Sequence, residues 1–125
     1  MIDIKTVSSA ALAYLGDSVI EVLVREHLVA KGISSSAHLN SEALKYVRAS
    51  AQAEAMKNII DLLTEEEEAA FRRGRNMGHS STPKSASVSE YRTATGMEAL
   101  FGWLHLSGKT ERMHELFSAA YKIDN

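Results

Sequence analysis

Two acidic side chains lie where the surrounding sequence is apolar or small. Asp17 follows a glycine in the run LAYLGDSV, and Glu98 lies between two glycines in the run TGMEALFG. A buried carboxylate needs a partner, because it loses the water that solvates its charge. If both acids face one crevice, carboxylates about 4 Å apart repel by up to about 4 kcal/mol at an effective dielectric constant of about 20, unless a proton or a cation lies between them.

The residues alone leave two interpretations of these acids open. In the first, Asp17 and Glu98 share a divalent cation, which removes the repulsion between them. In the second, Asp17 pairs with Arg25 or with a neighbouring helix, and Glu98 is exposed. Glu21 lies one helical turn from Asp17 on the same face, so we expect at most an indirect role for it at such a site.

The available ligand types favour magnesium over zinc in the first interpretation. Both acids offer oxygen atoms only, and the sequence contains no cysteine, no HExxH motif and no closely spaced pair of histidines. Oxygen ligands suit Mg²⁺, with Mn²⁺ as a substitute, whereas zinc sites use histidine and cysteine. The sequence therefore predicts a Mg²⁺ site if the two acids meet.

A second candidate site is the segment 69–89, which contains no acidic residue. Its basic residues, Arg72, Arg73, Arg75 and Lys84, stand out in a chain whose formal net charge is −2. Such a local concentration favours one anionic partner over general coating of nucleic acid. A solvated loop with ordinary surface arginines is the simpler interpretation of the same composition.

The elements that must position these residues are helices, since apolar residues recur every three or four positions and no stretch alternates like a strand. The predicted helices cover residues 8–32, 38–61 as one broken or two adjoining helices, 64–75, 87–106 and 110–123. The first is apolar on most sides and is expected to be central. The predicted core positions are Leu12, Leu15, Val19, Val22, Leu23, Leu44, Val47, Ala51, Ala55, Ile59, Leu62, Met97, Leu100, Phe101, Leu104, Met113, Leu116, Phe117 and Ala120.

Two capping boxes mark helix starts, one at Thr64 with Glu67 and one at Ser87 with Glu90. The acidic run 65–68 is interpreted as favourable helix electrostatics and not as a site, because a helix N-terminus attracts negative charge. Between these two helices lies the one extended loop, rich in glycine and serine.

Length and composition predict one all-helical domain over residues 1–125. With 125 residues and 45% hydrophobic content, the chain can bury a sufficient core without disulfides. The absence of cysteine excludes thiol chemistry and suits a reducing cytoplasm, where we expect the protein to be located. The longest apolar run, residues 10–15, is far shorter than the ~20 residues of a membrane span, and the N-terminal residues lack the apolar segment of a signal peptide.

The residues around both acids resemble the ribonuclease III family. The run LAYLGDSV is similar to the signature helix of that family, and TGMEALFG is similar to its second acidic motif. The runs VRASAQA at 47–53 and RRGRN at 72–76, with Tyr91 and Arg92, resemble more closely the Mini-III ribonucleases, the short bacterial branch without a double-stranded-RNA-binding domain. The similarity covers almost the whole chain.

This resemblance implies an all-helical endonuclease fold, a homodimer, and Mg²⁺-dependent cleavage of double-stranded RNA that leaves 5′-phosphate and 3′-hydroxyl ends. The implied substrate is the precursor of large-subunit (23S) ribosomal RNA, trimmed near its ends. Asp17 and Glu98 match the catalytic, metal-binding acids. The candidate contacts with the RNA backbone are Arg72, Arg73, Arg75, Asn76, His79 and Lys84, with Tyr91 and Arg92 as weaker candidates.

The sequence also departs from the family pattern at three acidic positions. Ala10 and Ala13 replace two glutamates before Asp17, and Thr95 replaces an aspartate before Glu98. We therefore expect one well-held metal ion, completed by water and RNA phosphate, instead of two. The same departures keep two alternatives open, namely a helical RNA-binding or assembly module that does no chemistry and a purely structural helical dimer.

Overall fold

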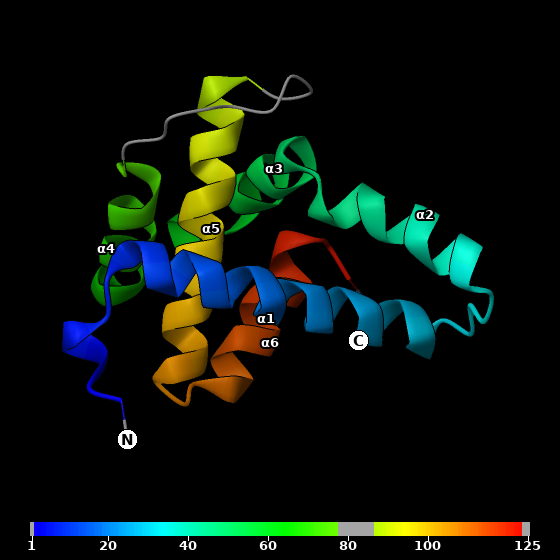
Figure 1. Cartoon of the computed structure of the whole chain (residues 1–125), viewed down its shortest axis with the longest axis horizontal. Coiled ribbons are helices and arrows are strands. Elements are labelled where there is room, and N and C mark those ends of the chain that lie inside the picture. The colour runs from blue at the N-terminus through cyan, green and yellow to red at the C-terminus, as the bar shows by residue number, and fades with distance from the viewer. Residues whose placement is uncertain (1, 78–86, 124–125) are drawn as a thin grey trace.

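The computed structural model describes residues 2–77 and 87–123, and every regular element in them is a helix (Figure 1). The elements are η1 (Ile4–Thr6), α1 (Ser9–Ala30), α2 (Ser36–Val47), α3 (Ala49–Ile59), η2 (Ile60–Leu62), α4 (Glu65–Arg75), α5 (Val88–Leu106) and α6 (Thr110–Ala120). The prediction of an all-helical fold is confirmed. No helix among the described residues has the length and apolar character that a membrane span requires.

The helix ends follow the local signals in the sequence. Ser8 caps α1, since its hydroxyl accepts a hydrogen bond from the backbone N–H of Ala11 at 3.1 Å. Both capping boxes form as predicted, at the start of α4 and of α5. The region 38–61 contains two adjoining helices, because Arg48 adopts an extended conformation between α2 and α3. The last helix ends at Ala120 instead of residue 123, since Lys122 has a positive φ of 54°.

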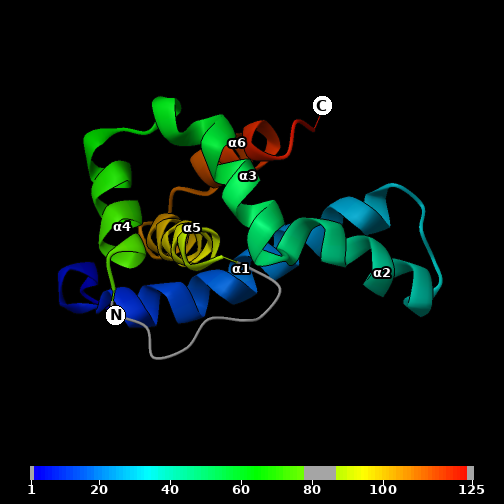
Figure 2. The ribbon, with the colours of Figure 1, turned by 90° about the horizontal axis from the view of Figure 1, so that it is seen from above.

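The central helix is α5. Seen along its axis, α5 lies between α4, α1 and α3, and it also contacts α6 (Figure 2). The expectation that the first helix is central is wrong: α1 packs across α5 with one side and leaves Tyr14, Val22 and Val29 exposed on the other. The small residues of α5 explain this placement, because they let neighbouring helices approach on several sides.

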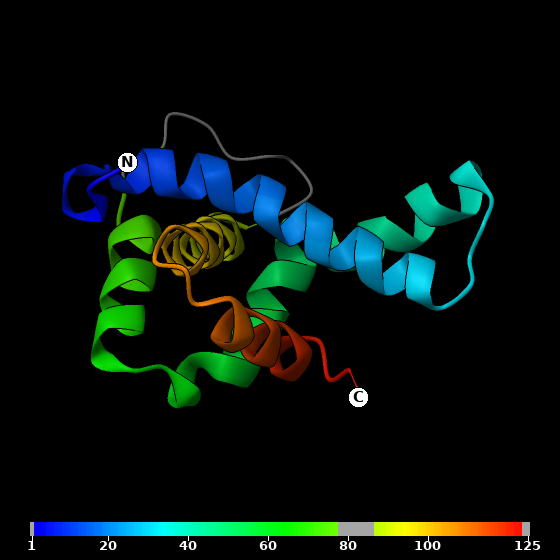
Figure 3. The same ribbon diagram turned by 90° about the horizontal axis from the view of Figure 1, so that it is seen from below.

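Most predicted core positions are buried, whereas Leu15, Val47 and Ala51 are only partly buried. All predicted positions on α5 and α6 are buried. Val22 is exposed because it lies on the outer side of α1, and Leu62 is exposed at the end of η2. Leu44 is exposed because α2 extends with the end of α1 away from the other helices (Figures 1 and 3) and has no fully buried residue.

Two glycines allow α1 and α5 to cross in backbone contact. A Cβ atom on Gly16 would lie 1.6 Å from the carbonyl oxygen of Glu98, and one on Gly102 would lie 2.0 Å from the carbonyl oxygen of Leu12. Real Cβ atoms do not come this close to a backbone oxygen, so any larger residue would push the helices apart. The glycines beside the two acids are therefore needed for the close crossing of their helices.

Candidate active site

Asp17 on α1 and Glu98 on α5 lie beside each other at this crossing. Gly16 immediately precedes Asp17 and touches the backbone of Glu98. The two carboxyl groups are close enough for the charge of Asp17 and a hydrogen bond with it to act on the pKa of Glu98. The close contact of the two helix backbones thus brings together two acids that are far apart in the sequence.

The environment of this acidic pair favours a proton on Glu98. Burial raises the pKa of Glu98 from 4.5 to about 8, and the negative charge of Asp17 and the hydrogen bond with it act in the same direction. At neutral pH the carboxyl group of Glu98 is therefore mostly protonated. The pair then carries one negative charge instead of two, as expected for acids that share a site without a cation.

No basic side chain neutralises the pair in the described part of the chain. None of the ion pairs found there involves Asp17 or Glu98. Arg25 pairs with Glu21 at 3.1 Å, and Glu98 is only partly exposed. The structure therefore differs from the interpretation in which Asp17 pairs with Arg25 and Glu98 is merely exposed.

The described residues offer two carboxylates at this place and no third ligand of the usual kinds. Among residues 2–77 and 87–123, no group of three or more His, Asp or Glu side chains is arranged to hold a metal ion. The three departures from the family pattern agree with this. Ala10 and Ala13 offer no donor, and the hydroxyl of buried Thr95 donates to the carbonyl oxygen of Tyr91 in its own helix at 3.0 Å.

The three weaker candidates, Glu21, Tyr91 and Arg92, lie on the same two helices as the acidic pair. Glu21 lies one turn beyond Asp17 on α1 and holds Arg25. Tyr91 lies seven residues before Glu98 on α5, so both are on the same side of that helix. Arg92 is exposed in the first turn of α5.

The three arginines at the end of α4 point in different directions. Arg72 pairs with Glu68 at 2.9 Å, one turn back on the same helix. The guanidinium of Arg75 lies 5.6 Å from the ring centre of Phe71, and its Nε donates to the side chain of Asn76. Arg73 borders a cavity described below. These candidate contacts do not converge on one point, and His79 and Lys84 lie outside the described residues.

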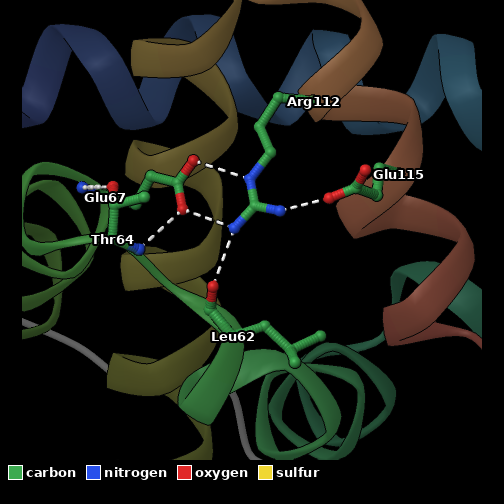
Figure 4. A network of polar contacts seen from close by, with 5 residues as sticks. All are labelled: Leu62, Thr64, Glu67, Arg112 and Glu115. Carbon is green, nitrogen blue, oxygen red and sulfur yellow. Dashed lines mark hydrogen bonds and ion pairs between the residues drawn. The ribbon is translucent and has the colours of Figure 1, made fainter.

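A buried ion pair that no sequence pattern predicts joins Glu67 to Arg112 (Figure 4). Glu67 is only 2% exposed, and its two carboxylate oxygens accept hydrogen bonds of 2.9 Å from Nε and Nη2 of Arg112. Arg112 also donates to the carbonyl oxygen of Leu62 at 2.7 Å and pairs with Glu115. The arginine holds the pKa of Glu67 below its usual value.

Only part of this arrangement could be found from the sequence. The capping box identifies Glu67 as the residue that accepts the backbone N–H of Thr64, and the structure confirms that hydrogen bond at 2.9 Å. Its partner Arg112 lies on α6, far along the chain, and no local pattern connects the two. The interpretation of residues 65–68 as helix electrostatics holds for the three exposed glutamates, whereas Glu67 also joins α4 to α6.

The chain is similar to known proteins over nearly its full length. The ribonuclease III domain family matches residues 10–109. The Mini-ribonuclease 3 of Thermoanaerobacter sp. is 43% identical, with 94% of this chain and 83% of that protein covered. The Mini-ribonuclease 3 of Enterococcus faecalis is 42% identical over 98% of this chain and 94% of that protein. The crystal structure of protein FN1578 from Fusobacterium nucleatum superposes with a TM-score of 0.86, at 31% identity and 98% coverage of both chains.

These matches show that the chain belongs to the ribonuclease III family. It is an endoribonuclease of the ribonuclease III type, and the relatives that it resembles over most of their length are Mini-ribonucleases 3.

Proposed function

We propose that this endoribonuclease depends on Mg²⁺, with Mn²⁺ as a substitute, and cleaves double-stranded RNA at a centre formed by Asp17 and Glu98. One observation carries the proposal: two acids on distant segments are held together without a basic partner in the described residues. Such an arrangement is unfavourable for folding and is typical of a site that takes a cation.

The donor set fits a hard divalent cation. Both acids offer oxygen atoms, and a cation between them would replace the proton on Glu98 and relieve the repulsion from Asp17. Because the described residues offer only these two carboxylates, water and RNA phosphate would supply the remaining ligands. The proposal therefore keeps one metal ion instead of two.

A bound Mg²⁺ supplies Lewis acidity at the phosphate and lowers the pKa of an attacking water. The carboxylates of Asp17 and Glu98 would bind the ion with their two negative charges and fix its position. Glu98 must lose its proton for this, so the chain can release a proton when the ion binds. The expected products carry 5′-phosphate and 3′-hydroxyl ends.

Basic residues near the end of α4 are the proposed contacts with the RNA. Arg72, Arg73, Arg75 and Asn76 lie at this end, and His79 and Lys84 follow in the sequence. Tyr91 and Arg92 begin the helix that carries Glu98. Lysine and arginine bind phosphate without reading bases, and A-form duplexes are recognised mostly by shape.

The second strand of a duplex requires a second acidic centre, which a homodimer supplies. We propose that the outer side of α1 forms the dimer contact. Tyr14 is 85% exposed there, and Leu15 and Val22 border an apolar groove that reaches Met113 of α6. Sedimentation of the wild-type protein and of the Tyr14→Ser variant tests this contact. We expect the wild type to sediment as a dimer and the variant to shift toward monomer. If both proteins sediment as monomers, the proposal is wrong.

The proposed natural substrate is the precursor of large-subunit ribosomal RNA, in the cytoplasm. The similarity to Mini-ribonucleases 3 of several bacteria supports the substrate class, and the cysteine-free composition agrees with a reducing compartment. Cleavage of a precursor transcript near the ends of the mature RNA, compared with a shuffled duplex, tests the assignment.

The decisive experiment is incubation of the protein with a long RNA duplex, in Mg²⁺ and in EDTA. We expect cuts in Mg²⁺ only, no cuts in single-stranded RNA of the same sequence, and products that RNA ligase joins without end repair. Binding without cleavage would favour an RNA-binding module, and neither binding nor cleavage would favour a structural role.

A further inference from the structure

A cavity lined by basic residues, called the basic cavity below, lies beside the crossing of α1 and α5. Along both helices, the crossing separates this cavity from the proposed catalytic acids. Its volume is about 420 Å³, and it is enclosed by η1, the start of α1, α4 and the end of α5. Lys5, Arg73 and Lys109 line it, together with the indole of Trp103. These residues come from four separate places in the chain, so only the fold brings them together.

The three basic side chains in this basic cavity have no acidic partner among the described residues. Arg25, Arg72 and Arg112 each form an ion pair, whereas Lys5, Arg73 and Lys109 form none. The acid that also lines the cavity, Glu66, makes no ion pair with them. Three positive charges around one hollow raise the local concentration of anions.

The indole of Trp103 gives the basic cavity an aromatic wall. Trp103 is partly exposed, and the ammonium group of Lys109 lies over its ring, 5.6 Å from the ring centre, so a base that stacks there takes the place of this ammonium group. Val7 and Leu12 complete an apolar floor beside it. An aromatic ring next to cations is the combination with which proteins bind single nucleotides, since a base stacks on the ring while the cations hold its phosphate.

The size of the basic cavity suits one nucleotide. Its volume lies in the range of pockets that hold small ligands. A base within a duplex has its faces covered by its neighbours, so only an unpaired base can stack on Trp103. The fitting ligand is therefore an aromatic base with a phosphate, and a duplex backbone alone would leave the indole unused.

The basic cavity is also within reach of RNA held at the acidic pair. Leu12 lies five residues before Asp17 on α1, and Trp103 lies five residues after Glu98 on α5. At 1.5 Å per helical residue, each spacing amounts to roughly 7.5 Å along a helix. Five residues also turn a helix by about 140°, so the cavity and the acids face different sides, and RNA that occupies both must pass around the crossing of the two helices.

We propose that this basic cavity binds one unpaired nucleotide of the RNA, with its base against Trp103 and its phosphate between Lys5, Arg73 and Lys109. The inference rests on the proposed function, because it takes the same RNA as the ligand. It makes the enzyme sensitive to single-stranded nucleotides that flank the duplex.

Trp103 is the only tryptophan of the chain, so its fluorescence reports on the basic cavity directly. In EDTA, we expect AMP at millimolar concentration to quench this fluorescence in a saturable way. Ribose 5-phosphate should compete with AMP without quenching, because it has phosphate but no base. Absence of saturable quenching by AMP would overturn the proposal.

A second measurement separates a nucleotide carried by RNA from a free nucleotide. Binding of a labelled blunt duplex is compared in EDTA with binding of the same duplex bearing one unpaired adenosine at its 3′ or its 5′ ends. We expect roughly tenfold tighter binding for one of the two extended duplexes, as is typical for a stacked base. Equal affinity for all three duplexes, with AMP bound, would limit the cavity to free nucleotides and overturn the proposal.

Variants assign the effect to the basic cavity. Trp103→Leu should abolish the preference for the extended duplex, and Trp103→Phe should retain part of it. Lys5→Gln and Lys109→Gln should each weaken AMP binding by about fivefold. Lys57→Gln, which removes an exposed charge from α3, is the matched control and should change nothing. If the lysine variants bind AMP like the wild type, the phosphate assignment is wrong even if Trp103→Leu does not fold.

Cleavage of the blunt duplex in Mg²⁺ shows whether a negative result contradicts this inference or the proposed function. Cleavage without any preference for unpaired nucleotides would overturn the inference about the basic cavity and leave the nuclease standing. Loss of metal-dependent cleavage, with AMP still bound in the cavity, would overturn the nuclease mechanism instead.

Discussion

Glu67 and Glu98 are both glutamates on helices that pack against the core, yet the fold treats them in opposite ways. Glu67 is buried with both carboxylate oxygens bound to Arg112, which lowers its pKa. Glu98 is held beside Asp17 without a basic partner among the described residues, and burial raises its pKa to about 8. The comparison separates an acid that joins two helices from an acid that has no basic partner among the described residues.

This difference has an energetic meaning. A buried charge whose hydrogen bonds are complete contributes to stability, whereas an incompletely compensated one lowers it. Natural folds retain such unfavourable groups at functional sites, where a ligand supplies the missing interactions. The following predictions test whether Glu67 and Glu98 differ in this way.

The largest expected effect is on cleavage. Glu98→Gln keeps the size of the side chain but cannot supply the charge that binds the cation, so we expect the rate to fall at least about 100-fold. Asp17→Asn should do the same, while duplex binding in EDTA is retained. Cleavage of labelled duplex RNA in Mg²⁺ measures both variants.

Glu67→Gln is the matched control for that experiment. It removes the same charge from the other glutamate, so cleavage per folded molecule should remain within a few-fold of the wild type. Full activity of Glu98→Gln, or an inactive but folded Glu67→Gln protein, would show that the two sites are assigned wrongly.

The second effect is on stability at the other acid. Arg112→Met leaves the carboxylate of Glu67 buried without its partner, so we expect the free energy of unfolding to fall by about 3 kcal/mol. The double variant Arg112→Met with Glu67→Leu should recover most of this loss, because both charges are then absent. Urea denaturation measures all three proteins.

The control for Arg112→Met is Arg25→Met, which breaks the more exposed pair with Glu21. Its cost should stay below about 1 kcal/mol. If both arginine variants are equally stable, the network in Figure 4 does not hold α4 and α6 together as the contacts indicate.

The third effect is on the pH dependence of stability without metal. Because the pKa of Glu98 is higher in the folded state, its contribution is fully present below about pH 4.5 and is lost as the pH rises through about 8. Glu67 has a lowered pKa, so its contribution is present above pH 4.5 and is lost as the pH falls. The two glutamates thus act at opposite ends of the pH range.

Glu98→Gln should remove this loss of stability at alkaline pH and stabilise the metal-free protein at pH 8 by up to roughly 4 kcal/mol. Thermal or urea unfolding in EDTA at several pH values measures this. If Glu98→Gln is less stable than the wild type at pH 8, the charge of Glu98 does not destabilise the fold. Glu67→Gln should instead change the stability at acidic pH.

The glycines and acids of α1 and α5 show what the sequence could predict. The spacing of apolar residues and the caps at Ser8, Thr64 and Ser87 predicted the starts of α1, α4 and α5, because these signals are local. The oddly placed acids at positions 17 and 98 identify a candidate site, since an acid in an apolar run is costly.

What the sequence could not provide depends on contacts between distant segments. The pairing of Glu67 with Arg112 joins α4 to α6, and the central place of α5 follows from how closely α1 and α4 approach it. Likewise, the cations of the basic cavity come from separate elements and show no pattern along the chain. Val22 illustrates the same limit. Its spacing fits the core, but it is exposed because it lies on the outer side of α1.

The smallest expected effect is the release of protons when Mg²⁺ binds. At neutral pH Glu98 holds a proton in the metal-free protein, and that proton must leave before both carboxylates bind the cation. We expect release of about one proton per site, measured by calorimetry in buffers of different ionisation enthalpy. The number should decrease as the pH rises above about 8, where Glu98 is already ionised, and Glu67→Gln should leave it unchanged. Magnesium binding without proton release at neutral pH would mean that Glu98 is not a ligand, and the contrast with Glu67 would then concern stability alone.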